Sequence, residues 1–299
     1  MSDVKSWLHS ITAVWWSRII FFILVVSILF PLTFLGEYPT SIALILSCII
    51  LSSTIFIESL RSSGKWYLVG LHLDRFTFIY LAYSLIFLII QFGLIIILGA
   101  FSGAQISYTC RQVNNYFINV VILIFCWAII EEVLFRGIIF QALLERFNPY
   151  LVIAVSGILF SVTHLFNQNV NLMSLINVFL AGVFLGTMYY TTKSLLFPIY
   201  YHFLWNLGTQ LLFSSPVSGF DFEIGMIRVD FVSVKSGFLW LFSGSFGIEE
   251  GFITTISFVI FIILSPVLIN PNPFIVSKLF IRRFNESRLT SEKYSTVKL

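Results

Sequence analysis

Three ionisable residues lie within six positions of an otherwise apolar stretch: Glu131, Glu132 and Arg136. The apolar run covers residues 116–147, and a helix of this length, rising about 1.5 Å per residue, is longer than the roughly 30 Å hydrocarbon core of a bilayer. An ionisable side chain at that depth costs at least about 2.5 kcal/mol, so it persists where it is paired, faces the protein interior or has a function. The stretch predicts a polar site inside a membrane.

Helix geometry separates the two carboxylates. Glu132 and Arg136 are four residues apart with the acid first, the order that lets their side chains meet across one helical turn. This pair could serve packing alone. Glu131 points roughly 100° away around the helix and has no partner within the segment. A second unpaired carboxylate adds desolvation cost without adding a contact, which favours a chemical role for Glu131.

Two later apolar segments carry further polar residues at helical spacing. Phe160 precedes His164 by four residues, and His202 precedes Asn206 by four, so each pair shares a helix face. Measured along their helices at about 1.5 Å per residue, the two histidines and Asn206 lie at depths compatible with that of Glu131. Each histidine alone is equally well explained by packing. Together, a carboxylate, two imidazoles and an amide have the chemistry to activate a water and stabilise an oxyanion.

The composition indicates an all-α, polytopic membrane protein. Of 299 residues, 58% are hydrophobic and only 10% are charged, and the mean hydropathy is +0.97. We therefore expect a single membrane domain, 1–299, with about eight transmembrane helices. Gly182 and Gly186 in the sixth predict close contact with another helix. The predicted spans are 19–35, 41–60, 76–101, 116–147, 150–166, 172–191, 195–213 and 251–268.

The basic residues orient these spans. Placing both termini in the cytoplasm puts 13 of the 17 Lys and Arg residues on the cytoplasmic side and three outside, and leaves Arg136 within the membrane. A basic cytoplasmic tail, 271–299, completes the chain. The cations lie near the ends of the predicted spans, which indicates that they set the orientation of the chain in the membrane. They do not form a basic surface, so we predict no nucleic-acid partner. His9 and His72 fall in polar flanks, and the three cysteines predict no disulfide framework.

The three motifs, Glu131-Glu132-x-x-x-Arg136, Phe160-x-x-x-His164 and His202-x-x-x-Asn206, resemble those of the CAAX protease and bacteriocin-processing family. This family of intramembrane proteases is also called Abi, and it includes the type II CAAX prenyl endopeptidases. All three motifs match in order and spacing. The segment 242–251 also resembles a loop that follows the third motif in many bacterial members.

The resemblance implies a membrane endopeptidase of the cell membrane whose catalytic core is 116–213 and whose substrate is a peptide or a membrane-associated protein. Glu131 and His164 would activate the attacking water. His202 and Asn206 would stabilise the tetrahedral oxyanion, and Glu132 with Arg136 would support Glu131. The family also includes proteins linked to bacteriocin immunity and peptide-signal processing.

Three alternatives remain open at this point. Glu131, His164 and His202 would supply the ligands of a catalytic zinc site, and the sequence does not separate this site from the metal-free chemistry without a cofactor that we expect. The spacing contains no HExxH pattern that would fix two ligands on one helix. A non-catalytic immunity or scaffold protein of the same fold is the second alternative. A proton-coupled transporter is the third, but the internal repeat of broken helices typical of transporters is not found.

Overall fold

The computed structural model describes residues 2–62, 69–71, 73, 75–109, 112–231, 233–234 and 237–269. The predicted tail 271–299, His72 and Cys110 lie outside these residues. Cys48 and Cys126 are free thiols.

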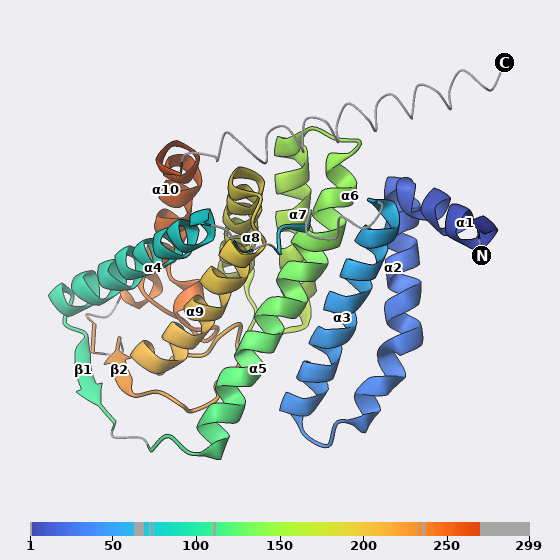
Figure 1. Cartoon of the computed structure of the whole chain (residues 1–299). Helices are drawn as coiled ribbons and strands as arrows, with labels where there is room; N and C mark the ends of the chain where they lie inside the picture. Colours follow the sequence, from blue (N-terminus) through green and yellow to red (C-terminus); the bar gives the residue numbers. More distant parts are fainter. Residues whose placement is uncertain are drawn as a thin grey trace.

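Helices make up most of the described chain (Figure 1). The α-helices are α1 (Ser2–Ala13), α2 (Trp15–Leu29), α3 (Pro39–Arg61), α4 (Arg75–Phe101), α5 (Asn115–Glu132), α6 (Gln141–Leu144), α7 (Pro149–Thr163), α8 (Leu172–Thr192), α9 (Leu196–Phe213) and α10 (Phe252–Leu268). A π-helical segment, Val133–Phe140, joins α5 to α6. Short 3-10 turns cover Phe30–Leu35, His164–Phe166, Leu239–Leu241 and Ile248–Glu250.

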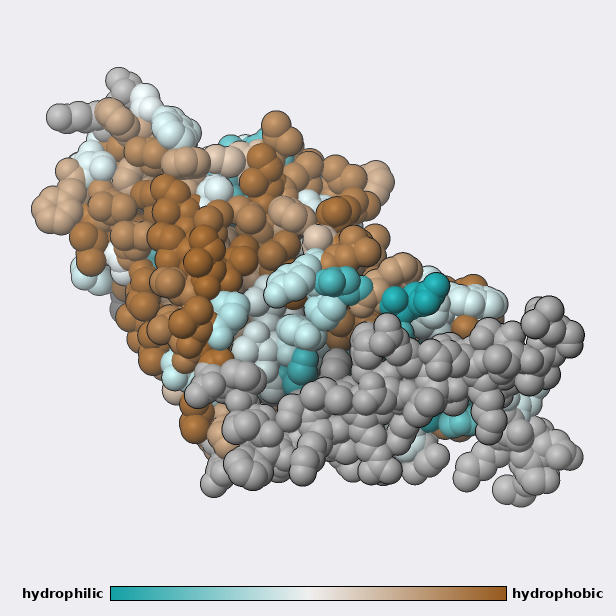
Figure 2. Space-filling view, turned by 90° about the horizontal axis from the view of Figure 1, so that it is seen from above, coloured by the Kyte–Doolittle hydropathy of each residue, from teal (hydrophilic) through white to brown (hydrophobic). Residues whose placement is uncertain are grey.

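Each predicted span corresponds to a helix. Within the described residues, six helical stretches are long and apolar enough to cross a membrane, with mean hydropathies between 1.8 and 2.6. Of the remaining two, α10 is shorter, and α9 carries the polar residues of the third motif. Figure 2 shows hydrophobic residues over much of one end of the molecule, with hydrophilic side chains gathered in smaller patches. The chain is thus a mostly helical protein with several helices that are long and apolar enough to cross a membrane. The number of eight spans stays a prediction.

The fourth predicted span differs in detail from expectation. It is one helical stretch, but it ends at Leu144, before the predicted end at residue 147, and its middle is π-helical. A π-helical stretch widens the helix by placing hydrogen bonds five residues apart, and such stretches are often found at functional sites. Here it begins directly after the two adjacent glutamates.

Asparagine side chains begin α5 and α7, which lead into the first and second motifs. Asn114 accepts a hydrogen bond from the Phe117 amide at 3.0 Å at the start of α5. Asn148, placed before Pro149, accepts one from the Tyr150 amide at 2.8 Å at the start of α7. These caps satisfy amides that have no partner inside the helix, which is why the predicted Asn-Pro boundary separates α6 from α7.

A small sheet departs from the all-α prediction. Strand β1 (Gln105–Tyr108) pairs antiparallel with β2 (Ile227–Asp230), and Ile106 lies opposite Val229. The two strands come from loops more than 100 residues apart, so no local pattern announces their pairing. The sheet ties the loop after α4 to the loop after α9 at one end of the molecule (Figure 1).

Two glycines bring α7 and α8 together. A Cβ placed on Gly182 of α8 would lie 2.9 Å from the Gly157 Cα of α7 and 3.2 Å from the Phe160 Cβ. The close approach that the sequence predicted for Gly182 is therefore present, and it sets the distance between the second motif and the π-helical segment. On the other side of the bundle, α4 lies across α9 and packs against it (Figure 1).

Candidate active site

The carboxylate of Glu132 joins Arg136 and His202 in one polar cluster. Arg136 Nη1 donates to Glu132 Oε1 at 2.9 Å, and both side chains are fully buried. Arg136 Nη2 donates to the carbonyl of Gly182 at 3.0 Å, so the guanidinium also joins the π-helical segment to α8. The pairing predicted from the four-residue spacing forms, even though Arg136 itself is in the π-helical segment.

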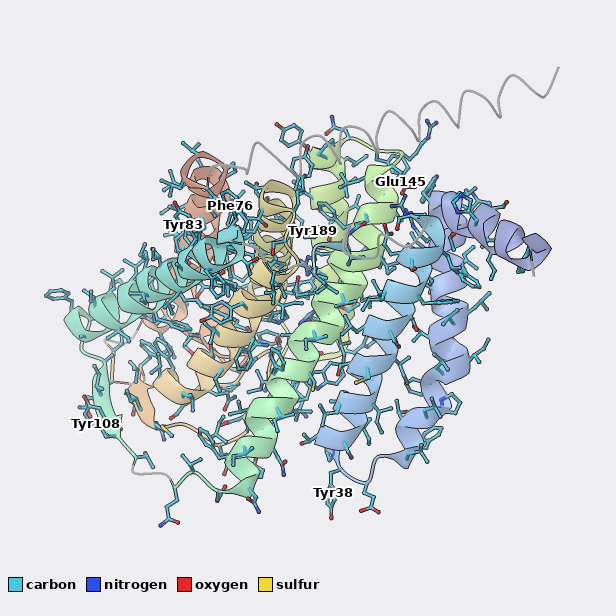
Figure 3. The ribbon with its side chains drawn as sticks, viewed as in Figure 1. Tyr38, Phe76, Tyr83, Tyr108, Glu145 and Tyr189 are labelled. Carbon is cyan, nitrogen blue, oxygen red and sulfur yellow. The ribbon has the colours of Figure 1, made fainter. Side chains whose placement is uncertain are left out.

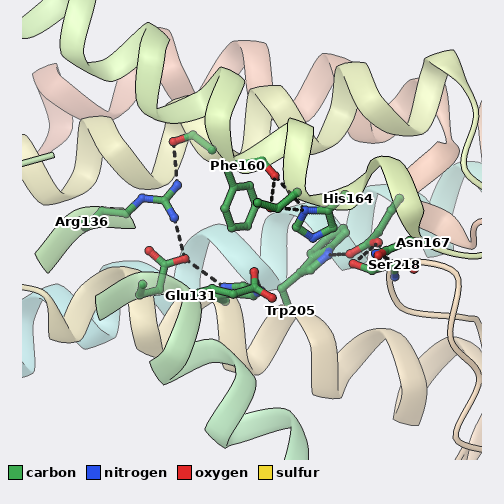
Figure 4. Close-up of polar contacts among 12 residues, drawn as sticks. Glu131, Arg136, Phe160, His164, Asn167, Trp205 and Ser218 are labelled. Carbon is green, nitrogen blue, oxygen red and sulfur yellow. Dashed lines mark hydrogen bonds and ion pairs between the residues drawn. The ribbon is translucent and has the colours of Figure 1, made fainter. Parts of the chain in front are cut away.

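The aromatic ring of Phe160 packs among the charged groups. The Arg136 guanidinium carbon lies 4.7 Å from the ring centroid, a distance that gives a cation–π attraction. The same ring lies 4.9 Å from the His164 ring and 5.9 Å from the His202 ring, centroid to centroid. Phe160 therefore holds side chains of three helical segments at fixed separations (Figure 4).

His164 is oriented by its own helix. Its Nδ1 lies 2.8 Å from the Phe160 carbonyl oxygen at the point where α7 tightens into the 3-10 turn His164–Phe166. Because a carbonyl oxygen only accepts, Nδ1 carries the hydrogen of this bond. In a neutral ring, Nε2 is then the acceptor nitrogen.

His202 contacts both glutamates of the first motif. Its Nδ1 lies 3.0 Å from Glu132 Oε1, and its Nε2 lies 4.0 Å from Glu131 Oε2. The two glutamates differ sharply: the Glu132 side chain is 0% exposed, while that of Glu131 is 24% exposed. Glu131 Oε2 is buried and has no hydrogen-bond partner in the described part of the chain. Oε2 of Glu132 also lacks a partner there, so what distinguishes Glu131 is its greater exposure and the absence of an arginine partner among the described residues.

A cavity adjoins this cluster. Its walls include His164, His202 and Asn206, and it has about 30 Å³ of room for the centres of water molecules. A buried water needs roughly 10 to 15 Å³ by this measure, so about two waters fit. Residues of the second and third motifs thus line one cavity, and this cavity can hold a water that could act as a nucleophile. Glu131 is not part of its wall and reaches the site beside His202.

A third carboxylate, from Glu249, also lines the cavity, and the motif analysis did not single it out. Its Oε1 accepts from Trp205 Nε1 at 2.9 Å, and its Oε2 accepts from the Ser218 amide at 2.7 Å. Burial raises the pKa of Glu249, while these hydrogen bonds and the charges of His164 and His202 lower it. The resemblance of the segment 242–251 was the signal that could have found this residue.

The predicted zinc ligands do not form a ready metal site. Among the described residues, no three His, Cys, Asp or Glu side chains are grouped so that they could hold one metal ion. His202 turns one ring nitrogen to Glu132, and His164 turns one to a backbone carbonyl. Bonds of this kind also orient histidines that bind metals, so only the separation of the three side chains counts here, and we derive no metal-dependent step.

Residues 113–208 match the family described as type II CAAX prenyl endopeptidase Rce1-like. The resemblance inferred from the motifs is confirmed over this segment, which contains all six predicted site residues. No curated protein and no solved structure matches the chain significantly. Glu249 lies outside the matched segment.

Proposed function

We propose, from the similarity to the type II CAAX prenyl endopeptidases, that the chain is an intramembrane endopeptidase that uses an activated water. One observation carries the proposal: a Glu131 carboxylate oxygen without a hydrogen-bond partner among the described residues lies 4.0 Å from His202 Nε2, next to a cavity that the second and third motifs line. An unpaired carboxylate beside an imidazole and water-sized space is the arrangement that a general base requires.

In the proposed reaction, Glu131 takes a proton from a water in the cavity, and His164 Nε2 orients that water. The resulting hydroxide attacks the carbonyl carbon of the scissile peptide bond. The C–N bond then breaks, and the proton held by Glu131 passes to the leaving amine nitrogen. No other reactant is needed, and the carboxylate is regenerated.

The oxyanion of the tetrahedral intermediate is stabilised by Asn206 and His202. The Glu132 carboxylate only accepts, so Nδ1 of His202 carries a hydrogen, and donation from Nε2 requires the imidazolium form. Glu131 and Glu132 together carry one more negative charge than Arg136 neutralises. An imidazolium at His202 balances this charge and places a donor towards the developing oxyanion.

The proposal includes eight spans in the cell membrane with both termini in the cytoplasm. The uneven distribution of 13 and three basic residues supports this orientation. A reporter fused after Leu299 should be cytoplasmic, and one inserted near Gly219 should lie outside. Reporters on the same side of the membrane would contradict the number of spans.

The catalytic role is tested by Glu131→Gln, which is nearly isosteric but removes the base. With the purified protein and farnesylated CAAX-type peptides, we expect cleavage to fall by about 10² to 10⁴. The matched control is Glu37→Gln, which removes an exposed carboxylate outside the site. Comparative membrane proteomics of wild-type and Glu131→Gln strains should reveal an accumulated precursor.

The outcomes separate the alternatives. Cleavage of a non-prenylated peptide alone would retain the protease and exclude prenyl recognition. Equal cleavage by wild type and Glu131→Gln would overturn the role of Glu131. A wild-type cellular phenotype in the Glu131→Gln strain, with no accumulated precursor, would favour a scaffold protein.

A further inference from the structure

The loop between α9 and α10 folds back onto the cavity. It begins at Ser214 and ends with the 3-10 turn Ile248–Glu250, and both Ser218, near its start, and Glu249, near its end, line the cavity wall. The Glu249 carboxylate joins these two parts of the loop through the Ser218 amide at 2.7 Å and hydroxyl at 3.3 Å. Glu249 thus joins the two ends of the loop at the cavity, together with Ser215, whose hydroxyl accepts from the Ile248 amide at 3.1 Å.

The same carboxylate holds α9. Trp205, whose indole donates to Glu249 Oε1 at 2.9 Å, is the residue before Asn206 and also lines the cavity. On its other side, Trp205 stacks on Phe92 of α4 at a centroid distance of 5.1 Å. The orientation of α9 about its own axis brings Asn206 and His202 to the cavity wall. The contact of Trp205 with Glu249 in the loop helps to fix this orientation.

Further hydrogen bonds fix the loop backbone at the cavity. Asn177 of α8 donates to the Glu249 carbonyl at 2.7 Å and to the Gly251 carbonyl at 3.0 Å. Asn167, in the turn after α7, donates to the Ser218 carbonyl at 3.1 Å. The helices that carry the second and third motifs and the intervening α8 are all connected to this loop.

The hydrogen bonds indicate that Glu249 is ionised. Each of its oxygens accepts from an N–H group, which a carboxylate does at both oxygens and a neutral carboxyl does poorly at one of them. No Lys or Arg forms an ion pair with it among the residues described. Burial raises the pKa of Glu249, so the charge opposes folding and a role in stability alone does not explain it.

We propose that Glu249 is a positioning residue that keeps Ser218 and the 3-10 turn Ile248–Glu250 joined at the catalytic cavity and fixes the face of α9 that presents His202 and Asn206. The inference rests on the proposed endopeptidase function. It does not make Glu249 the base, since both of its oxygens are already engaged as acceptors.

Glu249→Gln tests this role because the amide oxygen can replace only one of the two acceptors. Its NH₂ group would face either the Ser218 amide or the Trp205 indole, and two donors cannot bond to each other. The matched control is Glu250→Gln. Glu250 is the next residue, accepts from the Phe246 amide at 3.0 Å, and does not line the cavity.

Hydrogen–deuterium exchange gives a readout that does not depend on proteolysis. In Glu249→Gln, exchange in the peptide that contains Ser218 should speed up at least tenfold, while Glu250→Gln should leave it unchanged. Unchanged exchange in the peptide that contains Ser218 would overturn the proposed role of Glu249, whether or not the wild type cleaves peptides.

Kinetics then test positioning of the chemical step. We expect Glu249→Gln to lower kcat at least tenfold with little change in KM, and Glu250→Gln to cleave like wild type. Trp205→Phe keeps the ring but loses the indole donor, so it should lower kcat similarly, and the double variant should be no worse than either single variant. A wild-type kcat in Glu249→Gln, or losses that multiply in the double variant, would overturn the inference. Absence of any cleavage by the wild type would count against the proposed function alone.

Discussion

Two clusters of buried charge differ in how completely they are neutralised. The first joins α2, α3 and the turn after α6 at one end of the bundle, where Figure 3 labels Glu145. Arg18 Nη1 donates to Glu145 at 2.8 Å, and Arg61 bonds to Glu58 at 2.6 Å and approaches Glu145 at 3.5 Å. Two cations thus meet two anions across three segments, which is what a packing contact requires.

The second cluster is the candidate site, and its charges do not cancel. Glu131, Glu132 and Glu249 face one arginine and two histidines, and oxygens of both adjacent glutamates remain without hydrogen-bond partners in the described structure. Burying an unpaired charge costs free energy, so this cluster does not serve stability. The difference teaches that neutralised clusters hold helices together, whereas a cluster with spare acceptors can exchange protons.

Arg136→Ala should have the largest effect, since it leaves Glu132 fully buried without its cation. Breaking a buried pair costs about 3 to 5 kcal/mol, so both thermal stability and cleavage should be lost. Arg18→Ala should cost less, because Arg61 remains 3.5 Å from Glu145. Thermal unfolding in detergent measures both. Equal losses would show that the two clusters are held in the same way.

His202→Gln asks whether the unbalanced cluster works without a metal. If His202 acts as an oxyanion donor, the glutamine amide can still donate, and the rate should fall by about 10² to 10³ without vanishing. Cleavage by the wild type should also survive a strong chelator. Stoichiometric zinc by elemental analysis, lost in both His164→Ala and His202→Ala, would instead make these residues metal ligands.

Gly182→Ala tests how tightly the site depends on the approach of α8 to α7. The added methyl would lie 2.9 Å from the Gly157 Cα, so the backbones must separate, and overpacking of this kind costs about 1 to 3 kcal/mol. The shift would also pull the Gly182 carbonyl from Arg136. Gly186→Ala is the control, because its nearest neighbour is a Phe140 side-chain atom at 3.4 Å. Stability and cleavage rates should fall only in the first variant.

The sequence predicted the parts of this molecule that depend on local spacing. Apolar length and the Asn-Pro boundary gave the helices, and four-residue spacing gave the contact between Glu132 and Arg136. Contacts between distant segments were not predictable in this way. The β1–β2 pairing, the Arg18–Glu145 pair and the contact of Glu249 with Trp205 join residues at least 44 positions apart, where no periodic pattern operates. The π-helical segment was also missed, because its residues have the same apolar pattern as an α-helix.

Lys193 sharpens the comparison as a half-buried cation placed against a ring. It lies in the short link between α8 and α9, with Nζ 3.5 Å from the centroid of the Tyr190 ring. Burial lowers the pKa of Lys193 from 10.5 to about 7. Between these two pKa values the unfolded chain binds more protons than the folded one, so stability should rise with pH from about 7 towards 10. Lys193→Met removes the titrating amine and should flatten this rise, as measured by melting temperature across that range. A variant whose melting temperature rises with pH as steeply as that of the wild type would assign the dependence to other groups.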